Sequence, residues 1–155
     1  MGPGCRPILS PTSRYYSLRL VTVTEAPDLE SYRVFADRVI REDFSGEFRV
    51  TVRRNGISRP ICATGNDFPY RAQTKPTDDP GGYSTVDYPI SEWMGVGGLE
   101  CLNRIKADVS TLDDPHDGLY VMETCIQVKD LMFDPKPECA KAYFYYPRKT
   151  EETQG

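Results

Sequence analysis

A short stretch in the first half of the chain constrains the fold more than any other feature. Residues 48–63 read FRVTVRRNGISRPICA, with apolar and polar residues alternating on either side of an Asn-Gly pair. Alternation with a period of two is typical of a strand with one buried face, and Asn-Gly favours a two-residue turn of type I′. The stretch therefore predicts a β-hairpin that turns at Asn55-Gly56.

A two-residue turn would decide which residues of the two strands lie opposite each other. Val50 would face Ile61 and Phe48 would face Ala63, so that this mostly apolar face points inward. Pro60 has no N–H to donate to a neighbouring strand. The second strand is therefore predicted to lie at the edge of a sheet or to contain a bulge.

The hairpin also carries a candidate basic contact surface, formed by Arg49, Arg53, Arg54 and Arg59. Beside an open strand edge, these side chains suit an acidic protein partner, a phosphate group or another strand. The alternative is a solvated polar face on which arginine and proline discourage edge-to-edge aggregation. Nucleic-acid binding is not expected, because the pI is near 5.1 and no RNA- or DNA-binding motif is present.

Length and composition favour one β-rich domain. The 155 residues suit a single domain, and 13 Pro and 12 Gly favour many turns over long helices. Ten Tyr and six Phe also fit strands better than helices. We expect an antiparallel β-sandwich or jelly-roll-like domain at residues 15–147, with one short helix and long loops. Residues 1–14 are expected to form a flexible arm, and residues 148–155 a flexible tail.

The other elements are predicted from hydrophobic periodicity, which favours strands at 15–24, 99–109, 119–128 and 142–146. Residues 64–90 are rich in turn residues, and only 84–87 is expected to be extended. Residues 28–41 are ambiguous, because their apolar residues fit one helical stripe. A strand over Tyr32, Val34 and Ala36 would be interrupted at Arg38. We therefore expect the helix here, with a strand as the alternative.

The cysteines bear on the redox compartment. There are five, an odd number, and none are spaced as CxxC: Cys5, Cys62, Cys101, Cys125 and Cys139. This pattern favours reduced thiols over a disulfide framework or a zinc cluster. Without a recognisable signal peptide or an apolar run of about 18–20 residues, we expect an intracellular, cytoplasmic chain with no transmembrane segment. A mature secreted chain is the alternative.

Charge is unevenly divided along the chain. Residues 1–75 hold 12 Lys and Arg against 8 Asp and Glu, a net charge of +4. Residues 76–155 hold 7 against 15, a net charge of −8. If the fold keeps the halves apart, the dipole would steer head-to-tail self-association or docking to a charged protein. Interleaved strands would instead mix the halves and erase the dipole.

Two acidic loops suggest a calcium hypothesis, since carboxylates are the hard oxygen ligands that calcium prefers. The candidate ligands are Asp78, Asp79, Asp113, Asp114 and Asp117. Ordinary turn chemistry also explains these residues. The one histidine, His116, offers a general base beside these acids, although its sequence is that of an exposed turn.

Aromatic residues supply the remaining candidate site. Trp93, Tyr83 and Tyr88 could form a platform for a carbohydrate or another ligand, or they could fill the core. With no catalytic motif, the leading function is a non-catalytic binding or assembly module, a protein-binding or structural subunit of a larger complex, without a cofactor. The alternative is a β-sandwich module that binds calcium, lipid or carbohydrate. A small enzyme centred on His116 is the second alternative.

Overall fold

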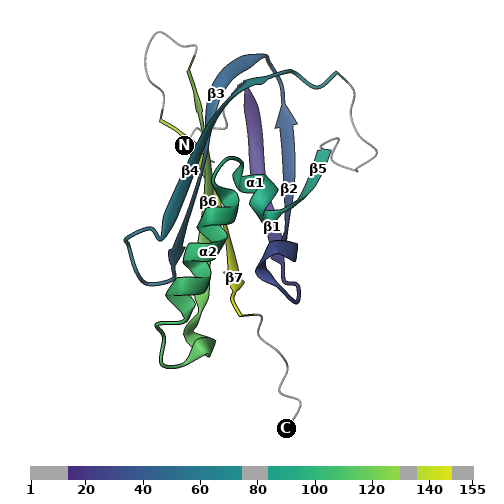
Figure 1. Ribbon diagram of the computed structural model, residues 1–155. Helices are drawn as coiled ribbons and strands as arrows, with labels where there is room; N and C mark the ends of the chain where they lie inside the picture. The colour runs from purple at the N-terminus through teal and green to yellow at the C-terminus, as the bar shows by residue number, and fades with distance from the viewer. Residues whose placement is uncertain (1–13, 75–83, 130–135, 148–155) are drawn as a thin grey trace, which may run out of the picture.

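The computed structural model describes residues 14–74, 84–129 and 136–147. Within these ranges the strands form two antiparallel sheets (Figure 1). The three-stranded sheet has the order β1 (Tyr16–Thr24), β2 (Arg33–Ile40), β5 (Ser84–Pro89). The four-stranded sheet has the order β4 (Cys62–Tyr70), β3 (Phe44–Arg54), β6 (Leu119–Val128), β7 (Glu138–Tyr145). The predicted mostly β, sandwich-like class is confirmed.

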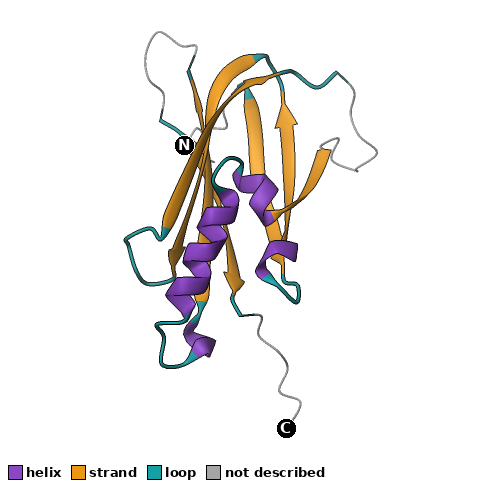
Figure 2. Ribbon diagram, viewed as in Figure 1, coloured by secondary structure: helices purple, strands orange, loops and turns teal. Residues whose placement is uncertain are grey.

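Along the chain, two helices lie between β5 and β6. They are α1 (Ile90–Met94) and α2 (Gly98–Val109), and short 3₁₀ turns occur at η2 (Leu29–Ser31) and η3 (Pro115–Asp117). Figure 2 shows both helices on one side of the molecule. There α2 contacts β4, and α1 contacts β2 and β5. No helix in the described part of the chain is long and apolar enough to cross a membrane.

The two sheets enclose one apolar core, to which alternate residues of each strand contribute. Two buried tyrosines join the sheets through their hydroxyls. Tyr16 of β1 donates to the carbonyl of Ile126 in β6 at 2.8 Å, and Tyr32 donates to the carbonyl of Tyr145 in β7 at 2.9 Å. Each ring fills the core while its polar end reaches a backbone acceptor, which removes the cost of burying the hydroxyl.

The hairpin prediction is right about the inward face of the first strand, but it is wrong about the register and about the face of the second strand. There Cys62 and Thr64 are buried, and Ala63, predicted to point inward, is exposed. Phe48, Val50 and Val52 are buried as predicted, and β4 is an edge strand. However, Val50 pairs with Thr64, three residues beyond the predicted Ile61. The connection between the strands is therefore longer than two residues, and Pro60 lies in it, outside β4.

The turn at Asn55-Gly56 also differs from the predicted type. The N–H of Ile57 donates to the carbonyl of Arg54 at 3.0 Å, which closes a four-residue turn. Gly56 has a φ of +87°, but no described residue other than glycine has a positive φ. A positive φ at the second central position alone is typical of type II and not of type I′. Type II does not match the twist of a tight hairpin, which is consistent with the longer connection.

In two segments the secondary structure differs from the prediction: a strand replaces a predicted helix, and a helix replaces a predicted strand. Residues 28–41 contain η2 and the strand β2, and residues 98–109 form helix α2. In α2 the buried side chains are Cys101, Leu102 and Ile105, a helical spacing. The apparent alternation through Leu99 misled the strand prediction, since Leu99 is exposed. Residues 64–70, predicted to be loop, continue β4.

The prediction of reduced cysteines is wrong for the described residues. Cys62 of β4 is bonded to Cys101 of α2, and Cys125 of β6 is bonded to Cys139 of β7. Cys125 and Cys139 are direct partners in neighbouring strands, a pairing that the sequence alone does not reveal. Cys5 lies outside the described residues. Because structural disulfides are rare in the cytosol, the argument for a cytoplasmic location no longer holds.

Candidate ligand-binding cleft

One cavity is lined mainly by aromatic side chains drawn from both sheets and from α1. Its lining residues are Arg38, Phe48, Phe68, Tyr70, Tyr88, Glu92 and Trp93. We call it the aromatic cleft. Its volume of about 310 Å³ is at the lower end of the range of small-molecule sites, which are largely apolar with a few polar groups. Arg38 and Glu92 are the charged residues of this lining.

Most ring pairs of the aromatic cleft meet at steep angles, whereas Tyr88 lies tilted at 44° to Trp93. Phe48 and Trp93 have ring centroids 5.3 Å apart at 75°, and Phe68 and Tyr70 are 5.9 Å apart at 70°. Such edge-to-face contacts hold rings in defined positions. Phe68 and Tyr88 are 43% and 41% exposed, whereas Trp93 is buried. The first two therefore form the accessible rim, and Trp93 forms part of the inner wall.

Trp93 is fixed by a buried hydrogen bond. Its indole Nε1 donates to the hydroxyl of Thr124 on β6 at 2.9 Å, and both residues are buried. The indole N–H is a donor only, so a hydroxyl acceptor at this depth satisfies it and orients the ring. This contact holds α1 against the four-stranded sheet.

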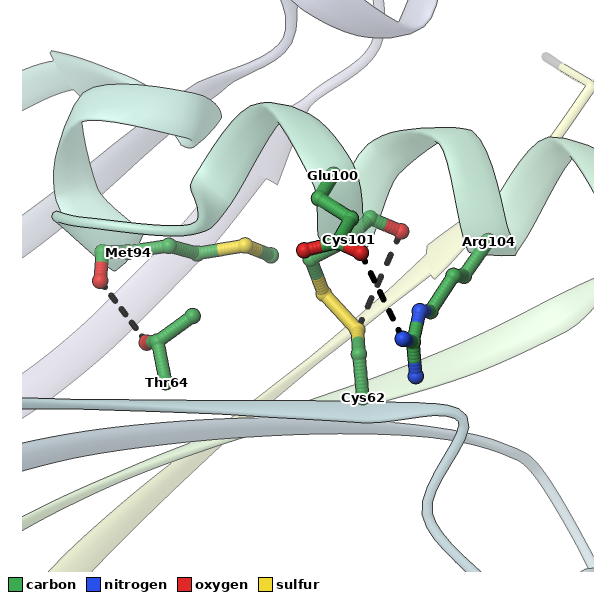
Figure 3. Close-up of a disulfide and its surroundings, with 6 residues drawn as sticks. All are labelled: Cys62, Thr64, Met94, Glu100, Cys101 and Arg104. Carbon is green, nitrogen blue, oxygen red and sulfur yellow. Dashed lines mark hydrogen bonds and ion pairs between the residues drawn. A yellow bond between two sulfur atoms is a disulfide. The ribbon is translucent and has the colours of Figure 1, made fainter.

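The edge strand β4 anchors the segment that carries Trp93. The hydroxyl of Thr64 and the amide of Asn66 both donate to the carbonyl of Met94, at 2.7 and 3.2 Å. Figure 3 shows the Thr64–Met94 bond beside the disulfide from Cys62 to Cys101. The carbonyl at the end of α1 is thereby satisfied, and β4 is tied covalently to α2. The wall of the aromatic cleft is therefore held in place before any ligand binds.

Arg38 lies at an inward position of β2, on the face that buries Val34, Ala36 and Ile40. Its Nε is buried and has no hydrogen-bond partner among the described residues. Nearby, burial raises the pKa of Tyr70 to about 12, and the positive charge of Arg38 partly opposes that rise. Tyr70 is thus protonated at neutral pH, and its hydroxyl is available as a donor.

The arginines predicted to form one basic surface are divided between two faces. Arg49 and Arg53 lie on the outer face of β3, where Arg49 pairs with Glu47 at 3.2 Å. Arg54 and Arg59 line a different cavity of about 440 Å³ beside α2. We call this cavity the arginine groove; Arg104 also lines it.

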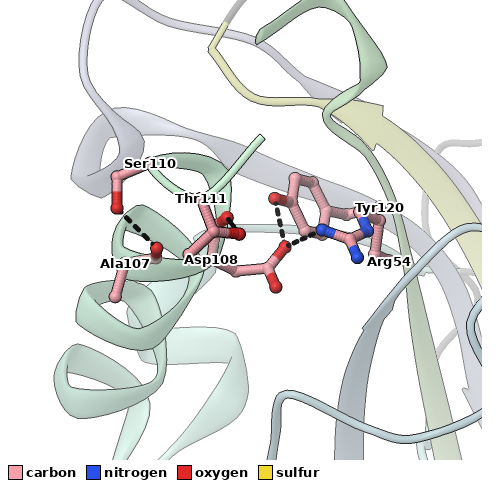
Figure 4. Close-up of polar contacts among 6 residues, drawn as sticks. All are labelled: Arg54, Ala107, Asp108, Ser110, Thr111 and Tyr120. Carbon is pink, nitrogen blue, oxygen red and sulfur yellow. Dashed lines mark hydrogen bonds and ion pairs between the residues drawn. The ribbon is translucent and has the colours of Figure 1, made fainter. Parts of the chain in front are cut away.

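Arg54 is part of a polar cluster that fastens α2 to the sheet (Figure 4). Its guanidinium contacts the carboxylate of Asp108 at 3.1 Å, and the hydroxyl of Tyr120 donates to the same oxygen at 2.8 Å. Tyr120 is fully buried, and burial together with the Asp108 charge raises its pKa. Arg54 therefore has a structural partner and is largely shielded. Arg104 also has a partner, since it pairs with Glu100 at 3.4 Å, but its side chain is 59% exposed. Arg59 and Arg104 are thus the more accessible cations of the arginine groove.

The acidic residues and His116 lie at the surface where they are described. Asp114 accepts hydrogen bonds from the backbone N–H and the Nδ1 of His116, each at 3.0 Å. The backbone bond holds the pKa of Asp114 below its ordinary value. The His116 side chain is 72% exposed. The described residues therefore do not enclose this side chain, and the enzyme hypothesis stays a prediction.

The calcium hypothesis stays a prediction. Asp113 and Asp117 are exposed, and Asp78, Asp79 and Tyr83 lie outside the described residues. Among the described residues, one set of acidic and cysteine side chains has the spacing of a metal site. It consists of Glu123, Cys125 and Cys139. The two sulfurs of that set are joined in a disulfide and are not free to bind a metal as thiolates.

Comparison with known proteins leaves the geometry to carry the functional argument. The chain matches no protein-family model, and no curated protein is similar to it. Of the cleft residues, sequence reasoning identified Trp93 and Tyr88 as candidates, and it missed Arg38, Phe48, Phe68, Tyr70 and Glu92. One signal was present, since Arg38 is the residue that interrupts the alternation of β2.

Proposed function

We propose that this chain is a non-catalytic binding module that takes a small molecule with a flat, apolar group into the aromatic cleft. The observation that carries the proposal is the convergence of five aromatic rings from β3, β4, β5 and α1 on one cavity. Two disulfides in the same small domain favour an oxidising compartment as its place of action.

The arrangement of the rings favours a ligand site, and not merely a core that is incompletely closed. Phe68 and Tyr88 keep more than two-fifths of their surface exposed, although both lie on strands beside a well-packed interior. Large aromatic groups left accessible next to a cavity mark a surface that gains apolar contact when a ligand binds. Trp93 behind them is already fixed by Thr124, so little ordering is required on binding.

A neutral fluorescent probe tests this proposal directly. Trp93 is the only tryptophan of the chain, so energy transfer from it reports a bound probe, and the cleft variants test whether that probe lies in the aromatic cleft. N-phenylnaphthylamine should give a saturable signal. Replacing Phe68 or Tyr88 by alanine should weaken its binding about two- to tenfold, because one ring contact contributes about 0.5–1.5 kcal/mol.

The matched control for these variants is Tyr143→Ala. Tyr143 is a 54% exposed aromatic residue on β7 that does not line the aromatic cleft. Its replacement should leave the binding curve unchanged. An absent or unsaturable signal in the parent protein, or equal loss in all three variants, would contradict the proposal.

A second candidate function is a protein-binding or assembly role at the arginine groove. Arg59 and Arg104 lie there beside the apolar side chains of Ile57, Ile61 and Ala107. Ile57 is 43% exposed, so apolar contact and positive charge are presented together. This combination suits an acidic protein segment, which would gain both apolar burial and charge pairing. A second copy of the chain is one source, since residues 76–155 have a net charge of −8.

Light scattering across a salt series tests the self-association form of this second candidate. At low salt we expect a mass above that of the monomer, which should return to the monomer mass at high salt because screening weakens exposed charge pairs. Arg59→Glu should abolish the larger species at low salt. A monomer at every salt concentration, even at high protein concentration, would contradict self-association.

A further inference from the structure

Arg38 occupies a position in the fold where arginine is seldom found. It lies on the central strand of the three-stranded sheet, and its neighbours on the same face, Ala36 and Ile40, are 0% and 4% exposed. Charged side chains are rarely placed on a core-facing position unless a partner neutralises them. The neighbouring acid, Asp37, faces the other way and pairs with Arg19 of β1.

Within the described part of the chain, no partner accounts for Arg38, whose side chain is partly buried. No ion pair joins it to a carboxylate anywhere in the described ranges, and its Nε is buried without a hydrogen bond. Glu92 is the carboxylate of the cleft lining, but it is exposed and forms no ion pair with Arg38. A buried donor without an acceptor is unfavourable, so an acceptor supplied by a ligand would relieve that cost.

The surroundings of Arg38 combine donors with apolar walls. Tyr70 lies close enough for its pKa to respond to the Arg38 charge, and at neutral pH it keeps its proton. A guanidinium binds a carboxylate or another oxyanion through directed hydrogen bonds, while the aromatic rings contact an apolar body. The same cavity therefore offers one end to an acid and the other to a flat apolar group.

From this arrangement we infer that the ligand of the aromatic cleft is an organic oxyanion with an apolar, aromatic-sized body. Its acidic group binds Arg38, and its body lies against Phe68, Tyr88 and Trp93. The inference rests on the proposed function and specifies the chemical class of ligand. It also explains why a strand that otherwise buries apolar residues carries an arginine at this position.

A matched pair of ligands separates the inference from the proposal beneath it. Phenylbutyrate and phenylbutyramide share one body and differ in charge at the head. In displacement of N-phenylnaphthylamine, the acid should bind about tenfold more tightly than the amide. The reason is that a hydrogen bond between two charged groups is stronger than one in which the ligand is neutral. In Arg38→Gln the two ligands should bind about equally.

The control variant is Arg33→Gln, on the same strand. Arg33 faces away from the core and pairs with Asp87, so its loss should leave the preference for the acid intact. Equal binding of acid and amide to the parent protein would overturn the inference while leaving the aromatic cleft as a binding site. A preference that survives Arg38→Gln would also overturn it. Failure of the neutral probe to bind would instead overturn the proposed function itself.

A second measurement does not depend on any ligand. If Arg38 is kept for a ligand and not for the fold, Arg38→Met should raise the thermal midpoint of the ligand-free protein by a few degrees, because it replaces an unpartnered buried donor with an apolar side chain. A structural role for Arg38 predicts a lower midpoint, and that result would overturn the inference.

Discussion

Replacing both Cys62 and Cys101 by alanine should lower the free energy of unfolding by about 4 kcal/mol. The two residues are 39 positions apart, and a cross-link of that length removes much of the conformational entropy of the unfolded chain. The loss should appear in guanidinium denaturation as a lower midpoint. Cys62 anchors the edge strand and Cys101 lies on the buried face of α2, so α2 should also lose protection against hydrogen exchange.

The second disulfide supplies the comparison. Cys125 and Cys139 are only 14 positions apart, so their replacement by alanine should cost less, about 3 kcal/mol. Alkylation before and after reduction, followed by mass spectrometry, should differ by four adducts, two for each bond. An equal number of adducts in the two samples would refute both disulfides. A larger loss from the Cys125–Cys139 pair would contradict the loop-length argument.

Replacing Phe144 by alanine should destabilise the protein by about 3–5 kcal/mol, the range for removing a large ring from a packed core. Phe144 is 2% exposed, and its ring lies 5.9 Å from those of Tyr32 and Tyr120. The ring therefore connects residues of both sheets. Denaturation monitored by circular dichroism measures the loss.

The neighbouring residue on the same strand is the control for Phe144. Tyr143 is 54% exposed and points to the opposite face, so Tyr143→Ala should change the free energy of unfolding by only about 0.5 kcal/mol. Similar losses from the two replacements would show that β7 does not bury the face assigned to it. The contrast therefore tests the register of β6 and β7 as well as the packing of one ring.

Periodicity was a reliable guide where one face of a strand is buried and the other is solvated. The alternation of Phe48, Val50 and Val52 predicted the inward face of β3, and the alternation in residues 119–128 predicted β6. Each of these predictions depends only on successive side chains pointing to opposite sides of a strand, which is a local property of the backbone.

Periodicity failed where a single residue breaks the pattern for a reason outside its own strand. Val34, Ala36 and Ile40 of β2 are buried, as is Tyr32 just before the strand, but Arg38 interrupts them and made a helix the better fit. The interruption coincides with the candidate site, where local consistency is often sacrificed to function. In α2 the opposite error arose, since a short apolar run fits either period, and Leu102, which a strand pattern would place on the polar face, is buried.

Neither the cysteine pairing nor the hairpin register was accessible from spacing. An odd number of cysteines without close spacing favoured free thiols, yet the fold brings Cys62 to α2 and Cys125 opposite Cys139. The bond from Cys62 to α2 places that side chain on the inner face of β4, which accompanies the three-residue difference in register. Both outcomes depend on elements that are distant along the chain.

The sequence by itself determined that this chain is mostly β and which faces of β3 and β6 point inward, because side-chain alternation follows from the backbone alone. Only the tertiary structure decided which strands became neighbours and what the aromatic cleft contains. Its residues run from Arg38 to Trp93 and come from five elements, so they meet only when both sheets and α1 have packed. A site assembled in this way has no local pattern, apart from the arginine that interrupts a buried strand.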